Sequence, residues 1–368
     1  MEFKIPKKIL AKQIGMNLKA IPTKTEQPIL KNLLVEAKAD GVTLTSTDGV
    51  LSVISNCSAS VIQQGSVCVE GKLLDAILKK IKKDIEITLR TENDELVLEI
   101  EASKMTIKTA NADEYPQLES FASTTSFEID GVSLIESIKQ TSGSTIKNES
   151  RPILSGILFK VEGNYLTLVS TDGYRMSLKI CKVTEVTGEK EVVVPVDSLV
   201  EVGRILASYK NATVHISFSD KGLLFIVDGV RIQTTLLTGE FIQYKKIFGM
   251  KAVTKAIIDK NALLNILERA TVFIPKSKLA LVSLKIEDDV VDVQIATESG
   301  NIEETIEANM TGEPLSITFN LSYLLLALTV MAGERVSFGF INNMSPCILE
   351  AVGNKAYKHM VLPVRPSI

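Results

Sequence analysis

The sequence contains no tryptophan, only two histidines and only four cysteines among its 368 residues. The histidines, His215 and His359, lie far apart along the chain, so we expect no histidine-based metal or acid–base centre. The cysteines form no Cys-x-x-Cys pair and match no zinc spacing; they are Cys57, Cys68, Cys181 and Cys347. Scattered thiols are typical of a reducing cytosol, and we expect them to pack as small apolar side chains.

Long uncharged apolar runs are also missing. The nearest candidate, Leu315–Met331, contains Asn320, Ser322 and Tyr323, which favours a buried helix of a soluble domain over a membrane span. The N-terminal residues are charged and precede no apolar run, which argues against a signal peptide. These absences predict a soluble, cytoplasmic protein without a membrane partner.

Motifs of common enzymes are absent: there is no Walker loop, Gly-x-Gly-x-x-Gly, Gly-x-Ser-x-Gly or His-Glu-x-x-His. The most tempting carboxylates are Asp48 and Asp172, each within Ser-Thr-Asp-Gly. Asp-Gly after an alternating strand is typical of a turn, where Asp accepts backbone N–H bonds and Gly takes a positive φ. We therefore expect no catalytic residue, no metal and no cofactor. A hydrolase that uses Asp172 is a minor alternative.

An internal repeat is the most informative feature that is present. Pro28-Ile-Leu is followed by a Ser-Thr-Asp-Gly segment whose Thr47 lies nineteen positions after the proline. Pro152-Ile-Leu and Thr171 have the same spacing, and a fainter copy runs from Lys278 to Thr297. Three copies at one spacing indicate a triplicated unit.

Each unit is predicted to contain two helices and roughly eight strands. Apolar periodicity places opening helices at 5–21, 132–146 and 262–274, and second helices at 72–81, 197–207 and 322–331. Asp197 and Ser322 are the expected N-caps of the last two. Short alternating stretches between them predict antiparallel strands. The predicted fold class is α+β, with domains at 1–122, 126–248 and 252–368.

Charge is unevenly distributed although the net charge is only −3. Windows that hold most of the predicted helices (3–25, 72–83, 139–151, 201–210 and 251–278) carry 22 basic and 5 acidic residues. The remainder carries 19 basic and 39 acidic residues. Two interpretations would explain this contrast between basic helices and an acidic remainder: solvated helix faces, or a polyanion that the helices of all repeats face. The segment 322–331 does not fit the second interpretation, because it has no basic residue.

The whole chain resembles the bacterial sliding clamps, the β subunits of DNA polymerase III. The resemblance is carried by the repeated motifs, by Ser170–Met176, by Phe319–Tyr323 and by the run Val361-Leu-Pro-Val-Arg365. It implies a head-to-tail homodimer that forms a ring around duplex DNA, with helices inside and strands outside. Weak phosphate contacts would then permit sliding without sequence preference. The residues implied to contact DNA are Lys12, Lys24, Lys79, Lys147, Asn148 and Arg151.

The resemblance also implies an apolar cleft that binds short linear peptides of the replicative polymerase, the clamp loader and repair polymerases. Its residues are Leu154, Thr171, Gly173, Tyr174, Arg175, Met176, Ile242, Lys246, Ile247, Leu279, Asn320, Tyr323, Met344, Pro346, Met360, Leu362, Pro363, Val364 and Arg365. Ordinary core packing is an alternative role for any one of them. Relatives often have Pro and Arg at the positions of Ile242 and Lys246, and often end before the last three residues of this chain, so peptide preference stays open.

For the homodimer, the resemblance places a late strand of the first repeat against the third repeat of the partner. The implied interface residues are Lys104, Met105, Ile107, Phe273, Ile274, Glu303 and Glu304. An internal strand and a helix end are the alternative interpretation. We therefore expect a processivity factor of the bacterial nucleoid. The second hypothesis is a clamp-fold peptide-binding scaffold that does not encircle DNA.

Overall fold

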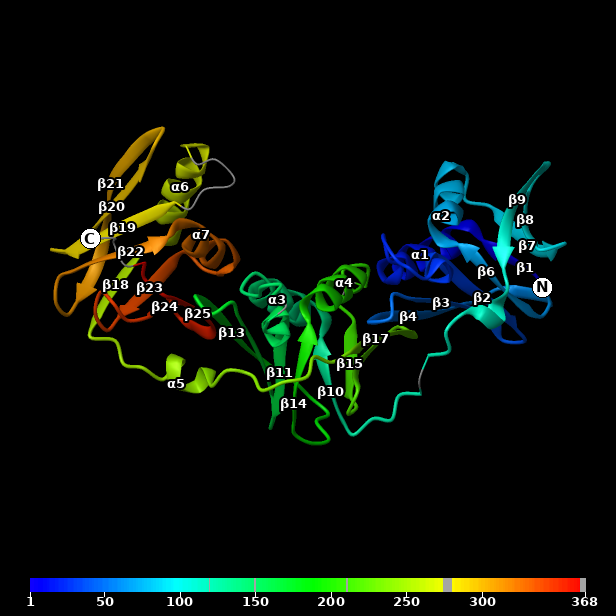
Figure 1. The fold of residues 1–368 in the computed structure, drawn as a ribbon, viewed down its shortest axis with the longest axis horizontal. Helices are drawn as coiled ribbons and strands as arrows, with labels where there is room; N and C mark the ends of the chain where they lie inside the picture. Colours follow the sequence, from blue (N-terminus) through cyan, green and yellow to red (C-terminus); the bar gives the residue numbers. More distant parts are fainter. Residues whose placement is uncertain (119, 149, 210, 274–279, 365–368) are drawn as a thin grey trace. The chain divides into compact units, whose positions relative to one another are not determined.

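The computed structural model describes residues 1–118, 120–148, 150–209, 211–273 and 280–364. The chain divides into two compact units. Unit 1 comprises residues 1–134, 183–188 and 197–236, and unit 2 comprises residues 135–182, 189–196 and 237–368. Each unit is built around one continuous antiparallel sheet (Figure 1).

The helices and strands recur in three repeats. The first contains β1 (Glu2–Pro6), α1 (Lys7–Asn17), β2 (Asn32–Lys38), β3 (Gly41–Thr47), β4 (Leu51–Cys57), β5 (Ser60–Gln63), β6 (Gly65–Glu70), α2 (Gly71–Lys80), β7 (Glu86–Glu92), β8 (Glu95–Ile100) and β9 (Ser103–Ala110). The second contains β10 (Thr125–Asp130), α3 (Gly131–Ser142), β11 (Gly156–Glu162), β12 (Tyr165–Thr171), β13 (Arg175–Lys182), β14 (Lys190–Pro195), α4 (Val196–Leu206), β15 (Thr213–Phe218), β16 (Gly222–Val227) and β17 (Val230–Thr235).

A short helix, α5 (Tyr244–Phe248), precedes the third repeat. That repeat contains β18 (Thr254–Asp259), α6 (Lys260–Ala270), β19 (Leu281–Glu287), β20 (Val290–Thr297), β21 (Gly300–Thr311), β22 (Leu315–Asn320), α7 (Leu321–Val330), β23 (Arg335–Phe340), β24 (Cys347–Ala351) and β25 (Asn354–Val361). Short 3-10 helices are η1 (Leu18–Ala20), η2 (Pro28–Lys31), η3 (Ala112–Glu114), η4 (Pro152–Ser155) and η5 (Thr271–Phe273). Two long helices per repeat, with antiparallel strands around them, confirm the predicted α+β class in the described residues.

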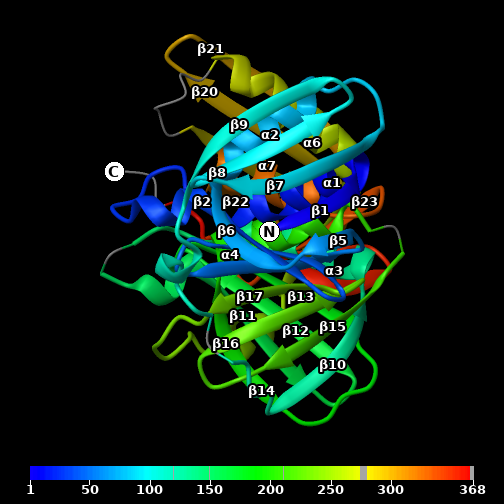
Figure 2. The same ribbon diagram turned by 90° about the vertical axis from the view of Figure 1, so that its right-hand side faces the viewer.

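Pairing between repeats makes each sheet continuous. In unit 1 the strand order is β10-β15-β16-β17-β4-β3-β2-β6-β9-β8-β7-β1-β5, so the last strand of the second repeat joins the first repeat at β4. Figure 2 shows β7, β8 and β9 of this sheet side by side. In unit 2 the order is β14-β11-β12-β13-β25-β24-β23-β18-β21-β20-β19-β22, and β25 joins β13 in the same way.

Helix starts differ from the sequence predictions at three places. Ile5 lies in β1, where it pairs with Ile87, so the first helix begins only at Lys7. α4 begins at Val196, which places Asp197 within its first turn instead of at the N-cap. α7 is capped by Asn320, whose side-chain oxygen accepts a hydrogen bond from the Ser322 N–H at 2.9 Å. Asn caps as well as Ser, and the strand β22 delivers it in the extended conformation that a cap requires.

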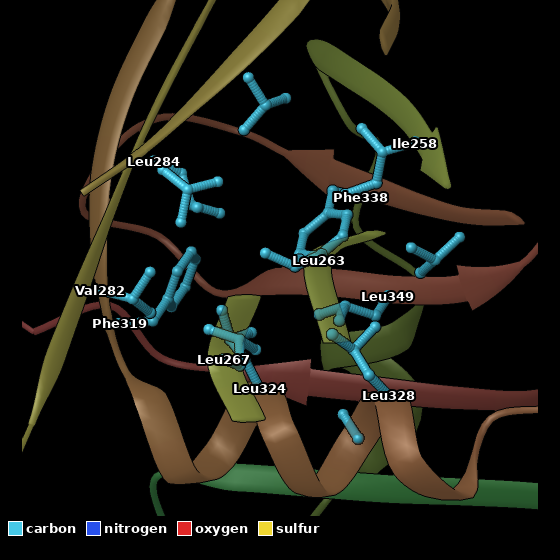
Figure 3. Packing of buried hydrophobic residues seen from close by; sticks show 14 of the residues in the cluster. Ile258, Leu263, Leu267, Val282, Leu284, Phe319, Leu324, Leu328, Phe338 and Leu349 are labelled. Atoms are coloured by element: carbon cyan, nitrogen blue, oxygen red, sulfur yellow. The ribbon is translucent and has the colours of Figure 1, made fainter. Parts of the chain in front are cut away.

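Apolar side chains between the helices and the sheet stabilise the third repeat (Figure 3). Leu263 and Leu267 from α6 meet Leu324 and Leu328 from α7, and none of these side chains is accessible to solvent. Phe338 from β23 closes the cluster at 2% exposure. Burying side chains of this size stabilises a fold by about 1.5–3 kcal/mol each before entropy is subtracted. The helices are therefore held by their apolar faces.

The cysteines pack as predicted: Cys57, Cys68 and Cys347 are buried, Cys181 is half-buried, and all four are free thiols. Burial raises the pKa of the Cys57 and Cys68 thiols to about 12, which leaves them unreactive. Within the described residues, no group of three or more metal-ligating side chains comes together. No described helix is both long enough and apolar enough to cross a membrane.

Candidate functional site

The turn between β12 and β13 lies beside the segment that follows β25 in unit 2. The Asp172 Oδ1 atom accepts hydrogen bonds from the backbone N–H groups of Tyr174 and Arg175, both at 2.9 Å. The Thr171 hydroxyl donates to the Arg175 carbonyl at 2.7 Å and accepts from the Gly173 N–H at 3.0 Å. Gly173 has a φ of +93°, a conformation that strains other residues. Asp172 therefore stabilises the turn through its hydrogen bonds, as its motif predicted.

The side chain of Arg175 is fixed from two sides. Its Nε donates to the Asp172 Oδ2 atom at 2.9 Å, and its guanidinium lies 4.4 Å from the centre of the Tyr323 ring. The pair is largely shielded, with side-chain exposures of 15% for Arg175 and 6% for Asp172. Burial raises the pKa of Tyr323, so its hydroxyl stays protonated. The result is an oriented cation on an aromatic platform.

The apolar cluster beneath this turn is built from two repeats. Met176 on β13 pairs in register with Met360 on β25, and the Leu362 N–H donates to the Tyr174 carbonyl at 2.9 Å. Met176 and Met360 belong to one cluster with Tyr244 of α5. Half-buried side chains that pack against this cluster are Ile153, Ile180, Leu237, Phe241, Ile247, Phe248, Ile348 and Leu362. Apolar surface with a few oriented polar groups is typical of a ligand cleft.

A buried polar network lies next to Met176 and Met360 along β13 and β25. The His359 Nδ1 atom is 2.9 Å from the Ser177 hydroxyl and 3.2 Å from the Tyr357 hydroxyl, and Ser177 also contacts the Ser144 hydroxyl at 2.8 Å. Burial, together with the nearby Arg175 cation, lowers the pKa of His359 to about 3. His359 is therefore neutral and structural.

Most residues predicted for the peptide cleft lie on these elements. Leu154 is buried on η4, Lys246 and Ile247 lie on α5, and the exposed Ile242 precedes that helix. The side-chain oxygen of Asn320 caps α7 by accepting the Ser322 N–H. Met344, Pro363 and Val364 border a neighbouring cavity of about 650 Å³. Pro346 and Phe248 line another of about 370 Å³. Two predicted residues, Leu279 and Arg365, lie outside the described residues.

Several residues of the cleft were missed by the sequence analysis. Phe241 and Phe248 pack against its apolar cluster, and Thr318 accepts the Val364 N–H through its carbonyl at 2.8 Å. The phenylalanines could have been found, because they flank Ile242 and Ile247 in the segment between the second and third repeats. Thr318 carries no signal in the sequence, since its role depends on the backbone path of residues far along the chain.

The residues predicted to contact DNA are all exposed. Lys12 on α1 lies 4.4 Å from the centre of the Tyr209 ring, and Lys79 on α2 pairs with Asp75 at 2.6 Å. The Asn148 side-chain oxygen accepts the backbone N–H groups of Ser150 and Arg151, so it shapes the turn that presents Arg151. Lys24 and Lys147 are the remaining exposed residues of this set.

One of the residues predicted for the dimer interface has a side chain that is buried within its own repeat. Ile107 is only 4% exposed and belongs to the core of the first repeat, so its side chain is not available to a partner. The alternation of β9 explains this, because Met105 and Ile107 share the face that packs inward. Lys104 pairs with Glu92 at 3.2 Å, Glu304 pairs with Arg269, and Phe273 is 37% exposed. Ile274 lies outside the described residues.

A triplicated α+β fold with continuous antiparallel sheets, in which neighbouring repeats share an apolar cluster, defines the sliding-clamp class of proteins. Family models of the DNA polymerase III beta subunit match the chain in order: the N-terminal domain at 1–119, the central domain at 128–243 and the C-terminal domain at 245–365. The chain therefore belongs to the DNA polymerase III β-subunit family, the bacterial sliding clamps.

Individual relatives agree over the full length. The beta sliding clamp of Halalkalibacterium halodurans is 29% identical over 382 residues, which cover 99% of this chain and all of the relative. That of Staphylococcus aureus is 27% identical over 376 residues, 99% of either chain. The crystal structure of the DNA polymerase sliding clamp from Bacillus subtilis covers 100% of both chains with a TM-score of 0.95 at 26% identity.

Proposed function

We propose that this chain is a DNA polymerase processivity factor: a non-catalytic homodimeric ring that encircles duplex DNA and tethers the polymerase. The membership of all three repeats in the clamp family carries the proposal. The proposed domains are 1–122, 126–248 and 252–368. A ring on DNA places the protein in the bacterial cytoplasm at the nucleoid.

DNA would be held through phosphate contacts by exposed lysines of the helices. Lys12 and Lys79 keep their ammonium groups on long, solvated side chains, which suits weak contacts that shift along the duplex. Reversal of Lys12, Lys79 and Lys147 to Glu should abolish retention on nicked circular DNA. The matched control reverses Lys38, Lys285 and Lys355, which lie exposed on strands; it makes the same change in net charge and should leave retention intact. Equal losses would contradict the proposed DNA face.

Partner peptides would dock in the cleft around Arg175. Its apolar floor suits leucine or phenylalanine anchors, and the fixed guanidinium and the turn orient the peptide backbone. The proposed partners are the replicative polymerase, the clamp loader and repair polymerases. A labelled peptide with two leucines at alternate positions should bind with one site per chain, and Tyr174→Ala should weaken it because Tyr174 is 62% exposed beside the floor. Unchanged binding in this variant would argue against the cleft.

The homodimer would form through two open strand edges. Among the described residues, β9 pairs with β6 only at Thr109 and Ala110, so one edge of Ser103–Lys108 has no strand partner. β21 pairs with β18 only from Ala308 onward, which leaves one edge of 300–307 open. The first edge carries Lys104 and Lys108 and the second Glu303, Glu304 and Glu307, so an antiparallel pairing would also be electrostatically complementary.

Light scattering tests the dimer directly. At micromolar concentration the expected mass is twice the 40.2 kDa of one chain. A monomer at that concentration would overturn the proposed ring and favour a clamp-fold peptide-binding scaffold that does not encircle DNA.

A further inference from the structure

A cavity of about 410 Å³ lies in unit 1, away from every residue assigned above to the peptide cleft. It is bounded by the end of β3, the turn into β4, strand β17, and the segment that follows β9. Its lining residues are Gln27, Leu30, Thr47, Gly49, Val50, Ser52, Pro116, Gln117, Leu118, Lys221, Gln233, Thr234 and Thr235. The cavity therefore borders, at the junction of the first two repeats, the turn that corresponds to Thr171–Arg175 at the junction of the last two.

The turn at Asp48 and the turn at Asp172 are held by the same set of hydrogen bonds. Asp48 Oδ1 accepts the backbone N–H groups of Val50 and Leu51 at 2.8 and 2.7 Å, as Asp172 does for Tyr174 and Arg175. The Thr47 hydroxyl donates to the Leu51 carbonyl at 3.1 Å and accepts the Gly49 N–H at 3.1 Å. Gly49 has a φ of +91°, against +93° for Gly173.

The strand that closes each cleft is held in the same register. The Thr235 N–H donates to the Val50 carbonyl at 3.0 Å, which corresponds to the bond from Leu362 to Tyr174 at 2.9 Å. Ser52 pairs with Gln233 across β4 and β17, just as Met176 pairs with Met360 across β13 and β25. The backbone frame of the peptide cleft is thus present twice in one chain.

The residues that correspond to the two methionines and to Leu362 are polar on this second frame, whereas Leu30, Val50, Pro116 and Leu118 add apolar side chains to the lining. Ser52 and Gln233 replace the two methionines of the floor, Thr235 replaces Leu362, and Leu51 stands at the position of Arg175. Amide side chains reach the cavity from three separate segments, namely Gln27, Gln117 and Gln233. Within the described residues these three amides make no side-chain hydrogen bond, so each offers a donor and an acceptor. Lys221 is the one charged residue of the described lining.

We propose that this cavity is a second peptide-binding cleft, which takes a neutral extended segment bearing amide and hydroxyl side chains. The frame argues for an extended peptide, and the three amides argue for polar side chains on that peptide, because a leucine placed against them would leave them unpaired. One chain would then select two kinds of segment: an apolar one at Arg175 and a polar one at Gln233. The inference rests on the proposed peptide-binding role of the cleft around Arg175.

The test uses two fluorescein-labelled short peptides and the full-length protein. One peptide alternates glutamine and serine; the other has leucine in place of each glutamine. Anisotropy titration should show saturable binding of the glutamine peptide at or below millimolar concentration. Gln233→Leu should weaken it at least about fivefold, since the variant removes a hydrogen-bonding amide. Gln27→Leu should act in the same direction, and this side chain is exposed, so the variant cannot fail by disrupting the core.

Matched controls separate the two clefts. Gln63→Leu makes the same substitution at an exposed position on β5 in unit 1, outside the cavity, and should leave the binding of both peptides unchanged. Tyr174→Ala should weaken only the leucine peptide. The second cleft is refuted if the glutamine peptide does not bind saturably, or if Gln233→Leu and Gln27→Leu bind it as the wild type does. Failure of the leucine peptide alone would instead overturn the cleft around Arg175.

Discussion

Asp48 occupies in the first repeat the position that Asp172 occupies in the second, so a substitution of Asp48 is a matched control for a substitution of Asp172. Asp172→Ala removes three hydrogen bonds: two from backbone N–H groups and one from the Arg175 guanidinium. Asp48→Ala removes only the two backbone bonds of the equivalent turn, because Leu51 stands where the second repeat has Arg175. The difference between the two variants isolates the bond that orients Arg175.

The magnitudes follow from the number of bonds lost. At about 1 kcal/mol net per hydrogen bond, Asp48→Ala should lower the free energy of unfolding by about 2 kcal/mol and Asp172→Ala by about 3 kcal/mol. For binding of the leucine peptide, Asp172→Ala should raise Kd about tenfold, because the guanidinium loses one of its two fixed contacts and must be ordered again on binding. Asp48→Ala should leave that Kd unchanged.

Urea unfolding followed by circular dichroism measures the first quantity, and fluorescence anisotropy with the leucine peptide measures the second. The reasoning would be refuted if both variants weakened the peptide equally, since the effect would then be a general loss of stability. It would also be refuted if Asp172→Ala were destabilised but bound the peptide as the wild type does, because orientation of Arg175 would then be irrelevant.

Three further predictions concern stability and assembly. His359 is held neutral in the fold, because its pKa is lowered to about 3. Its contribution to the free energy of unfolding is therefore complete above the unfolded-state pKa near 6.5 and is lost as pH falls below that value. Between pH 6.5 and 5 the contribution of His359 to the free energy of unfolding should fall by up to about 1.4 kcal/mol per pH unit. Urea titrations at several pH values should therefore show a shallower slope for His359→Gln than for the wild type, and equal slopes would contradict this assignment. Reversal of Lys104 and Lys108 to Glu should shift the protein toward monomer in sedimentation experiments, and mixing with a Glu303→Lys, Glu304→Lys variant should restore heterodimers; persistence of the homodimer would rule out the β9 edge. Phe338→Ala should cost about 3–5 kcal/mol in thermal or urea unfolding, and a loss under about 1 kcal/mol would contradict the core assignment.

The turns and the helices of this chain could be predicted from the sequence. The Ser-Thr-Asp-Gly motifs predicted turns at Asp48 and Asp172, and the hydrogen bonds are those that Asp and Gly supply in such turns. Apolar periodicity found the six long helices of the repeats to within a few residues. Such features depend on neighbours along the chain, so a single sequence contains them.

Long-range contacts were not readable in the same way. The pairing of β17 with β4 and of β25 with β13 joins residues that are far apart in sequence, and no periodicity encodes it. The stacking of Arg175 on Tyr323 depends on that pairing. The burial of Ile107 was not predicted, because alternation shows that a strand has two faces without showing which face is inward.

The cavity in unit 1 illustrates the same limit. Gln27, Gln117 and Gln233 share no motif and no spacing, so only the fold brings them to one cavity. The repeat was visible in the sequence, but the change from a methionine floor to an amide floor has meaning only once the two registers are aligned.

Retention on DNA of defined topology tests the central claim most directly. The protein is loaded onto nicked circular duplex, the free protein is removed by gel filtration, and half of the sample is then linearised with a restriction enzyme. A ring that encircles DNA stays on the circle and slides off the linear ends, so the account predicts that protein remains with circular DNA and is lost from linear DNA. Equal retention on both would mean that the protein binds DNA by contact alone, and would contradict the account.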